Sequence, residues 1–191
     1  MNAKRIISAT IASALLALTL CIACGCQPSN EDVIRDTVTQ NFDAYKNLED
    51  SVLSEIAAEA EEDGMSDLGI TGEEYASAVL DGFDYSINSI TVNDKAATVS
   101  MTIVSKSKTD FYNKLNDAVS SFVADPATEE LTADQKDTQI GTIAMQAFQD
   151  TETVSEDVEL LFQLQGNTWV SVNSAEVLGN LDSFAFPSNV A

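Results

Sequence analysis

The sequence contains no histidine, and its three cysteines all lie within residues 21–26. Without histidine the chain lacks the commonest general base, so Ser-His-Asp and Cys-His catalysis and the usual zinc sites are excluded. The cysteines stand only two or three residues apart, which disfavours a disulfide among them, and no later thiol can pair with them. We therefore expect no disulfide framework, no metal site and no cofactor.

Basic residues are also scarce. The 191 residues include nine Lys and Arg against 31 Asp and Glu, a formal net charge of −22. Because Lys4 and Arg5 precede every acidic residue, the chain after residue 25 keeps seven basic residues and a formal charge of −24. Such a surface repels nucleic-acid phosphates, so we expect no nucleic-acid partner. The charge serves solubility, although it can also attract cations or basic peptides.

The first 25 residues have the pattern of an export signal. Met1–Arg5 carries two cations, and Ile6–Ala23 follows as an uncharged, mainly apolar run of about 18 residues. That length also suits a membrane-spanning helix, so an uncleaved signal anchor stays the alternative. Polar interruptions such as Ser8 and Thr10, and the small residues at the end of the run, favour cleavage.

The segment Ile22-Ala-Cys-Gly-Cys26 resembles the lipobox of bacterial lipoproteins, in which apolar and small residues precede a cysteine. The resemblance implies that this thiol receives diacylglycerol and that the cysteine becomes the mature N-terminus. We predict lipidation at Cys26, which follows Gly25, with Cys24 as the alternative. Two acyl chains anchor a protein stably. The predicted location is the outer face of the bacterial cell membrane, with the membrane as partner through the lipid.

The apolar content of 45% supports a hydrophobic core, and the length suits one domain after the export signal. We predict a signal peptide over residues 1–25 and a lipid-anchored tether over 26–30. A single acidic domain follows over 31–186, and 187–191 form a tail. No internal repeat or low-complexity tract divides the domain.

Apolar residues recur at helical spacing in the first part of the domain. A helix preceded by the capping residue Ser29 is predicted, and a second helix or bent continuation ends at Gly64; their inward residues are Ile34, Val38, Phe42, Tyr45, Leu48, Val52, Ile56 and Ala60. A third, short helix begins after Thr71. The acidic residues 59–63 end the second helix without the spacing of a calcium loop, so fraying in solvent is preferred to a bound cation.

Two hairpins are predicted around a pair of helices. Alternating residues indicate strands near 83–92, 97–103, 158–164 and 168–173, with a bulge near Asn88–Ser89. The helices between the hairpins are predicted to be capped by Thr109 and Thr132. Because helices and strands do not alternate, we predict an α+β fold, an antiparallel sheet of about four strands packed against helices.

The run Gly82–Val99 and the segment Gly166-Asn-Thr-Trp169, together with the lipobox, resemble small bacterial lipoproteins that have a cystatin-like or nuclear-transport-factor-like domain. The resemblance covers about Glu31–Leu181 and implies a curved sheet wrapped around helices. It implies a fold and a location, and no reaction.

Some members of this fold class are enzymes that use a carboxylate inside a cone-shaped pocket. The candidates here are Asp84 or Asp110, with Tyr85 or Tyr45 nearby. Strand alternation places Asp84 toward solvent, however, and Asp110 belongs to the first turn of a helix. We therefore predict no catalytic residue and a protein that is not an enzyme.

Aromatic residues raise two alternatives for binding. Trp169, opposite the valines of the last strand, is a candidate partner face, although a core tryptophan is the default. The other aromatic residues suit a core more than a ligand pocket: Phe42, Tyr45, Phe83, Tyr85, Phe111, Phe148 and Phe162. The favoured function is a binding or protein-interaction module of the bacterial envelope. A lipoprotein that binds a small ligand or a cation is the alternative, and a purely structural component or an enzyme follows it.

Overall fold

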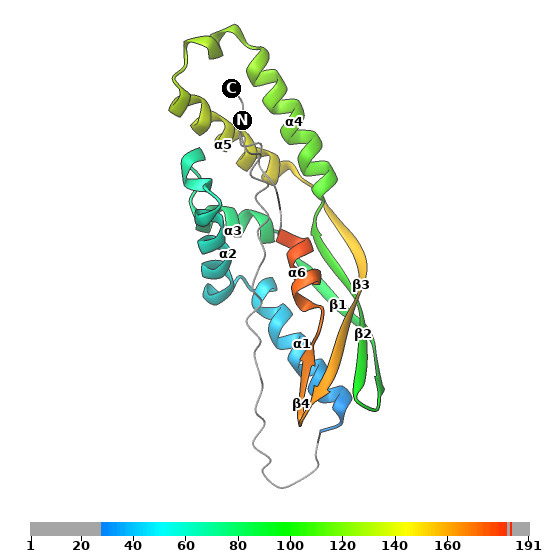
Figure 1. Ribbon diagram of the computed structural model, residues 1–191. Helices are drawn as coiled ribbons and strands as arrows, with labels where there is room; N and C mark the ends of the chain where they lie inside the picture. Colours follow the sequence, from blue (N-terminus) through cyan, green and yellow to red (C-terminus); the bar gives the residue numbers. More distant parts are fainter. Residues whose placement is uncertain (1–27, 183, 185–191) are drawn as a thin grey trace, which may run out of the picture.

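The computed structural model describes residues 28–182 and Phe184. The predicted signal peptide, both candidate lipidation sites Cys24 and Cys26, and the predicted tail lie outside the described residues. Within this part of the chain, helices α1 to α6 and a four-stranded antiparallel sheet form an α+β fold, which confirms the predicted class (Figure 1).

Two amphipathic helices open the domain, α1 (Asn30–Lys46) and α2 (Asp50–Glu62). The predicted capping box is present, because Ser29 Oγ accepts from the Asp32 amide at 3.1 Å and the Asp32 carboxylate accepts from the Ser29 amide at 3.1 Å. A turn at Leu48 separates the two helices; this residue has a positive φ of 53° and is 38% exposed. The prediction that Leu48 faces the core is therefore wrong, because the turn directs it outward.

A short 3₁₀ helix, η1 (Met65–Leu68), leads to α3 (Gly72–Leu80). Thr71 and Glu74 form a capping box at the start of α3, where the sequence predicted a helix. Gly72 lies so close to α2 that a Cβ atom there would stand 2.4 Å from the Ala57 carbonyl oxygen. This glycine therefore permits the first turn of α3 to contact the backbone of α2.

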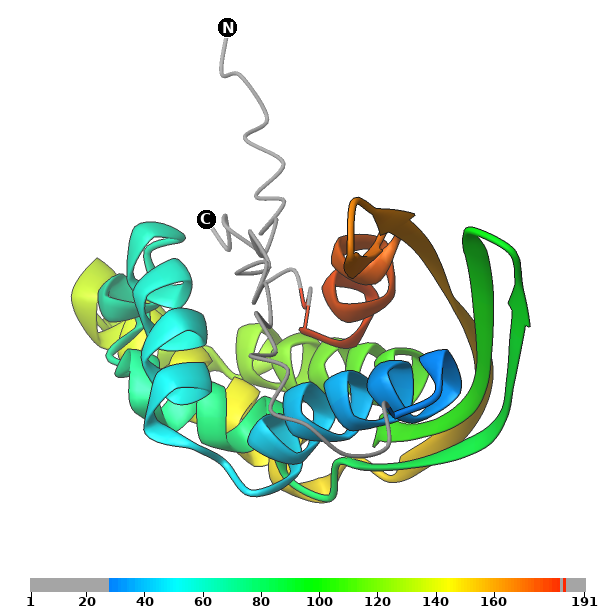
Figure 2. The ribbon, with the colours of Figure 1, turned by 90° about the horizontal axis from the view of Figure 1, so that it is seen from below.

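The strands β1 (Asp84–Asn93), β2 (Ala96–Lys106), β3 (Thr153–Gln165) and β4 (Thr168–Ser171) pair in chain order, each antiparallel to the next. The predicted bulge is confirmed by a register shift between Ile87 and Ser89. The β1–β2 turn contains Asp94 with a positive φ of 52°. Figure 2 shows that the sheet curves strongly, with α1 and α6 (Ser174–Asp182) on its concave side.

Between the two hairpins the chain forms α4 (Lys108–Ala124), a 3₁₀ helix η2 (Pro126–Glu130) and α5 (Ala133–Asp150). These helices extend beyond the end of the sheet (Figure 1). The N-cap of α4 is Ser107 and not the predicted Thr109, since the Ser107 hydroxyl accepts from the Asp110 amide at 3.2 Å. The sheet decides between the two candidates, because the Ser107 amide donates to the Glu152 carbonyl oxygen at 2.9 Å directly beyond the β2–β3 ladder.

One continuous core joins the sheet and the helices. At the junction, Phe111 of α4 and Phe148 of α5 stack with ring centroids 4.1 Å apart. Phe184, beyond α6, packs edge-on against both rings at 5.1 and 5.0 Å. Phe184 therefore belongs to the hydrophobic core.

Candidate functional site

A cavity of about 470 Å³ lies between the helices α1 and α2 on one side and β3, β4 and α6 on the other. Its walls are mainly apolar, and the apolar lining residues are Val38, Phe42, Ala44, Tyr45, Val52, Leu160, Phe162, Trp169, Val170 and Leu178. The volume lies in the range of small-molecule sites, which is about 300–1,000 Å³. This cavity is the best candidate for a binding site in residues 28–182.

The spacing of apolar residues along each helix or strand explains which side chains face the cavity. On α1, Val38, Phe42 and Tyr45 lie on the buried face that also packs against the sheet. On β3, the alternation that directs Leu160 and Phe162 inward brings both to the cavity. The concave sheet and the amphipathic helices therefore leave room for a ligand at the point where α1 ends and α2 begins.

Polar residues also line the cavity: Thr37, Gln40, Asn41, Glu49, Ser51, Glu55, Gln165, Ser171 and Ser174. Trp169 donates from Nε1 to Asn30 Oδ1 at 3.3 Å, which ties β4 to the first residue of α1. Ser171 also lines the cavity, and its Oγ atom is buried without a hydrogen-bond partner in the described structure. An unpaired buried hydroxyl costs about 1–3 kcal/mol, so a hydrogen-bond partner for Ser171 Oγ would be stabilising. A polar ligand atom would supply such a partner.

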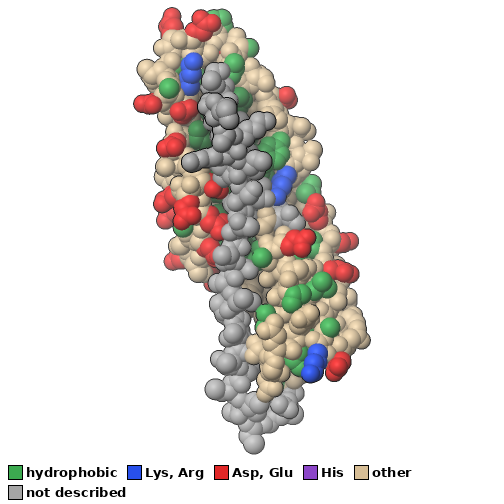
Figure 3. All heavy atoms as spheres, in the orientation of Figure 1, with side chains coloured by type: hydrophobic (Ala, Val, Ile, Leu, Met, Phe, Trp, Pro, Cys, Tyr) green, Lys and Arg blue, Asp and Glu red, His purple; other side chains and the backbone are tan. Residues whose placement is uncertain are grey.

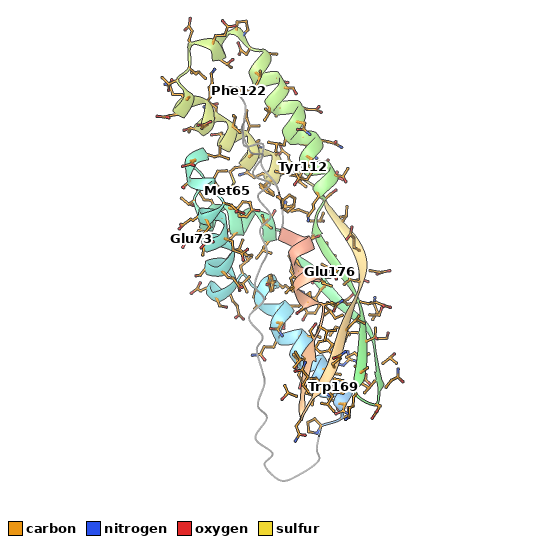
Figure 4. All side chains as sticks on the ribbon, in the orientation of Figure 1. Met65, Glu73, Tyr112, Phe122, Trp169 and Glu176 are labelled. Carbon is orange, nitrogen blue, oxygen red and sulfur yellow. The ribbon has the colours of Figure 1, made fainter. Side chains whose placement is uncertain are left out.

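Trp169 lies beside α1 near one end of the sheet (Figure 4). It is 6% exposed and belongs to the hydrophobic core, so the alternative of an exposed partner face around Trp169 is corrected. The reason is the alternation of side chains along β4, because Trp169 pairs with Leu164 on the concave side while Val172 lies on the solvent side. Val172 is 49% exposed. Trp169 therefore belongs to the wall of the cavity.

Neither candidate base, Asp84 nor Asp110, lines the cavity. Asp84 is exposed, as predicted, and its carboxylate pairs with the Lys46 ammonium at 2.7 Å, which together with the Tyr85 amide lowers the pKa of Asp84. Asp110 lies in the first turn of α4, also as predicted. Hydrogen bonds from Lys114 and from the Glu152 amide lower the pKa of Asp110. Both carboxylates are therefore held in the ionised form by partners outside the cavity.

The two candidate tyrosines differ in environment. Tyr45 lines the cavity, whereas Tyr85 lies on β1 outside it. The Tyr85 hydroxyl donates to Asp43 Oδ1 at 2.8 Å. Partial burial and the neighbouring Asp43 carboxylate raise the pKa of Tyr85 to about 12. The structure therefore does not bring Tyr85 together with either candidate base in the cavity.

The acidic surface of residues 28–182 offers no assembled metal site. Figure 3 shows Asp and Glu side chains spread over the visible face, with few Lys and Arg among them. At the end of α2, partial burial and the neighbouring Glu62 raise the pKa of Asp63. Within the described residues, no group of three or more Asp or Glu side chains is arranged to hold a metal ion.

The helices described here also include none with the length and apolar character of a membrane span.

No protein-family model matches the chain, and no curated protein matches it. Among solved structures, the chain is similar to ycdA of Bacillus subtilis, which is assigned as a lipoprotein, with 9% sequence identity and a TM-score of 0.45. The match covers 81% of this chain and 47% of the other, so the chain spans about half the length of that structure. A likeness this distant identifies no family, and the resemblance to cystatin-like and nuclear-transport-factor-like domains stays a prediction.

The sequence did not single out the cavity as a site. Phe42, Tyr45 and Phe162 were noted as aromatic residues that could line a pocket, and these three do. The contributions of Ser171 and Glu55 were missed. One feature of the sequence indicates the cavity: Ser171 is a polar residue at an inward position of the last strand, where an apolar residue would otherwise fill the core.

Proposed function

We propose that the protein is an exported, lipid-anchored lipoprotein of the bacterial envelope whose domain binds a small, mainly apolar ligand. The observation that carries the binding proposal is the cavity of about 470 Å³ with its aromatic and aliphatic walls and a buried, unpaired serine hydroxyl. The basic start, the apolar run and the cysteine in a lipobox context support export and anchoring.

Binding without catalysis is proposed, because the two carboxylates that the sequence offered as bases, Asp84 and Asp110, have partners outside the cavity. Asp84 pairs with Lys46, and Asp110 is bonded to Lys114 and to the Glu152 amide. The favoured partner is a small molecule and not a protein, since Trp169, the residue that suggested a protein-binding face, is buried.

A neutral fluorescent probe tests the binding proposal. N-phenyl-1-naphthylamine should bind the unmodified domain with increased dye fluorescence, because an apolar site removes the dye from water. Ser51, at the start of α2, lines the cavity and is exposed, so Ser51→Phe should obstruct the cavity without disturbing the core. We expect the affinity for the dye to fall about tenfold or more, which corresponds to 1.4 kcal/mol.

Ser54→Phe is the matched control. Ser54 is also an exposed serine of α2, but it does not line the cavity. This variant should bind the dye as the unmodified domain does, and thermal denaturation should show that both variants are folded. Equal dye binding by the two variants, or no binding by the unmodified domain, would contradict the proposal.

A further inference from the structure

The charged residues that line the cavity are all acidic. They are Glu49, which caps the N-terminus of α2, and Glu55, one and a half turns further along the same helix. Glu49, Val52 and Glu55 follow at intervals of three residues, which places them on neighbouring positions of the helix surface. Glu55 is half-buried, whereas Glu49 is exposed. Both carboxylates therefore belong to the wall that α2 contributes.

No lysine or arginine of the described chain lines this cavity. The two basic residues of α1 are engaged with acids of their own. Lys46 pairs with Asp84 at 2.7 Å, and Arg35 pairs with Glu31 at 3.0 Å. A negatively charged ligand would therefore meet two carboxylates and no cation from the cavity walls.

The helix dipole affects the charges of Glu49 and Glu55 to different extents. The amides at the N-terminus of α2 carry a partial positive charge, which offsets the charge of Glu49. This effect falls off within the first turn, and Glu55 lies beyond it. Glu55 is therefore the carboxylate whose charge acts on a bound ligand with least compensation.

On the basis of the proposed function, we infer that the ligand is a cationic amphiphile with an apolar body and an ammonium group. The apolar body lies against Phe42, Phe162 and Trp169, and the ammonium group lies beside Glu55. The net charge of −22 favours the approach of such a ligand, and it opposes the approach of fatty acids and other anions.

Three probes with the same apolar body and different head groups test this inference: octylammonium, octanol and octanoate at pH 7. The chain has a single tryptophan, and this residue lines the cavity, so Trp169 fluorescence reports binding directly. Octylammonium should bind most tightly and octanoate least tightly. Glu55→Gln should weaken octylammonium binding about three- to fivefold, as expected for a partly solvated ion pair, and leave octanol binding unchanged.

Glu62→Gln is the matched control, because it removes the same charge from the same helix at an exposed position outside the cavity. It should change the affinity for octylammonium by less than about twofold in 0.15 M salt, where distant charges are screened. If octanol or octanoate binds as tightly as octylammonium, or if the two variants behave alike, the inferred ligand class is wrong while the proposed cavity function stands. If the dye binds and none of the three probes does, the inferred ligand class is wrong; if neither the dye nor the probes bind, the proposed function itself is wrong.

Discussion

Among single residues, Gly141 permits a close contact between α5 and η1 because it has no side chain. A Cβ atom on Gly141 of α5 would lie 2.0 Å from the Leu68 carbonyl oxygen of η1. Because this oxygen belongs to the backbone, a rotamer change cannot relieve the clash. The glycine is therefore required by packing, and its position in the middle of a helix costs stability that the close contact offsets.

Gly141→Ala should lower the free energy of unfolding by about 3 kcal/mol, the upper end of typical overpacking effects, since η1 must move away from α5. Urea denaturation measures this change. Gly179→Ala in α6 is the control, because a Cβ atom there has no neighbour within 4 Å. It should raise the stability by about 0.5–1 kcal/mol through helix propensity. A Gly141→Ala protein as stable as the unmodified one would show that the contact is not tight.

At the scale of elements, the short strand β4 is completed by a side chain. Beyond Ser171 the Val172 amide still donates to the Leu161 carbonyl oxygen at 2.8 Å. Asn173 then takes over the pairing: its Oδ1 accepts from the Leu161 amide at 2.8 Å, and its Nδ2 donates to the Glu159 carbonyl oxygen at 2.9 Å. The Asn173 side chain thus provides hydrogen-bond partners for two backbone groups of β3 at the point where the chain leaves the sheet for α6.

Asn173→Ala should therefore destabilise the domain by about 1–2 kcal/mol, because two backbone groups lose their partners. Amide hydrogen exchange should locate the effect, with faster exchange at Leu161 than in the unmodified domain. Asn167→Ala, in the exposed turn between β3 and β4, should leave both quantities nearly unchanged. Unaltered protection of the Leu161 amide in Asn173→Ala would rule out this role for the side chain.

Local sequence signals predicted most elements, and their failures have a common cause. The capping boxes at Ser29, Thr71 and Thr132 were found because they involve residues only three positions apart. The cap of α4 was misplaced because Ser107 and Thr109 are equally good caps locally. The hydrogen bond from the Ser107 amide to Glu152, 45 residues away, decided between them.

For the whole molecule, the proposed anchor precedes the first helix of the domain by only a few residues in the sequence. The helix α1 begins at Asn30, four residues after Cys26 in the sequence. A domain with a net charge this negative would be held near the membrane by the lipid against repulsion from anionic head groups.

The lipid anchor can be tested by metabolic labelling. Cells that express the full chain should incorporate radiolabelled palmitate into the protein, and Cys26→Ala should abolish the label because the acceptor thiol is lost. Cys24→Ala is the control and should remain labelled. Loss of label only in Cys24→Ala would move the site to that cysteine. An unlabelled full chain would contradict anchoring by lipid.

The α+β class, the capped helices, the alternating strands and the bulge could all be predicted from the amino-acid sequence. These features depend on interactions between residues that are near in the chain or on a simple period of apolar side chains. The inward orientation of Trp169, and the cavity that β4, α6 and α2 form with α1, become visible only in the folded chain. That outcome depends on the curvature of the sheet and on the register of strands that are distant in the sequence, and both arise from pairings that no local pattern records.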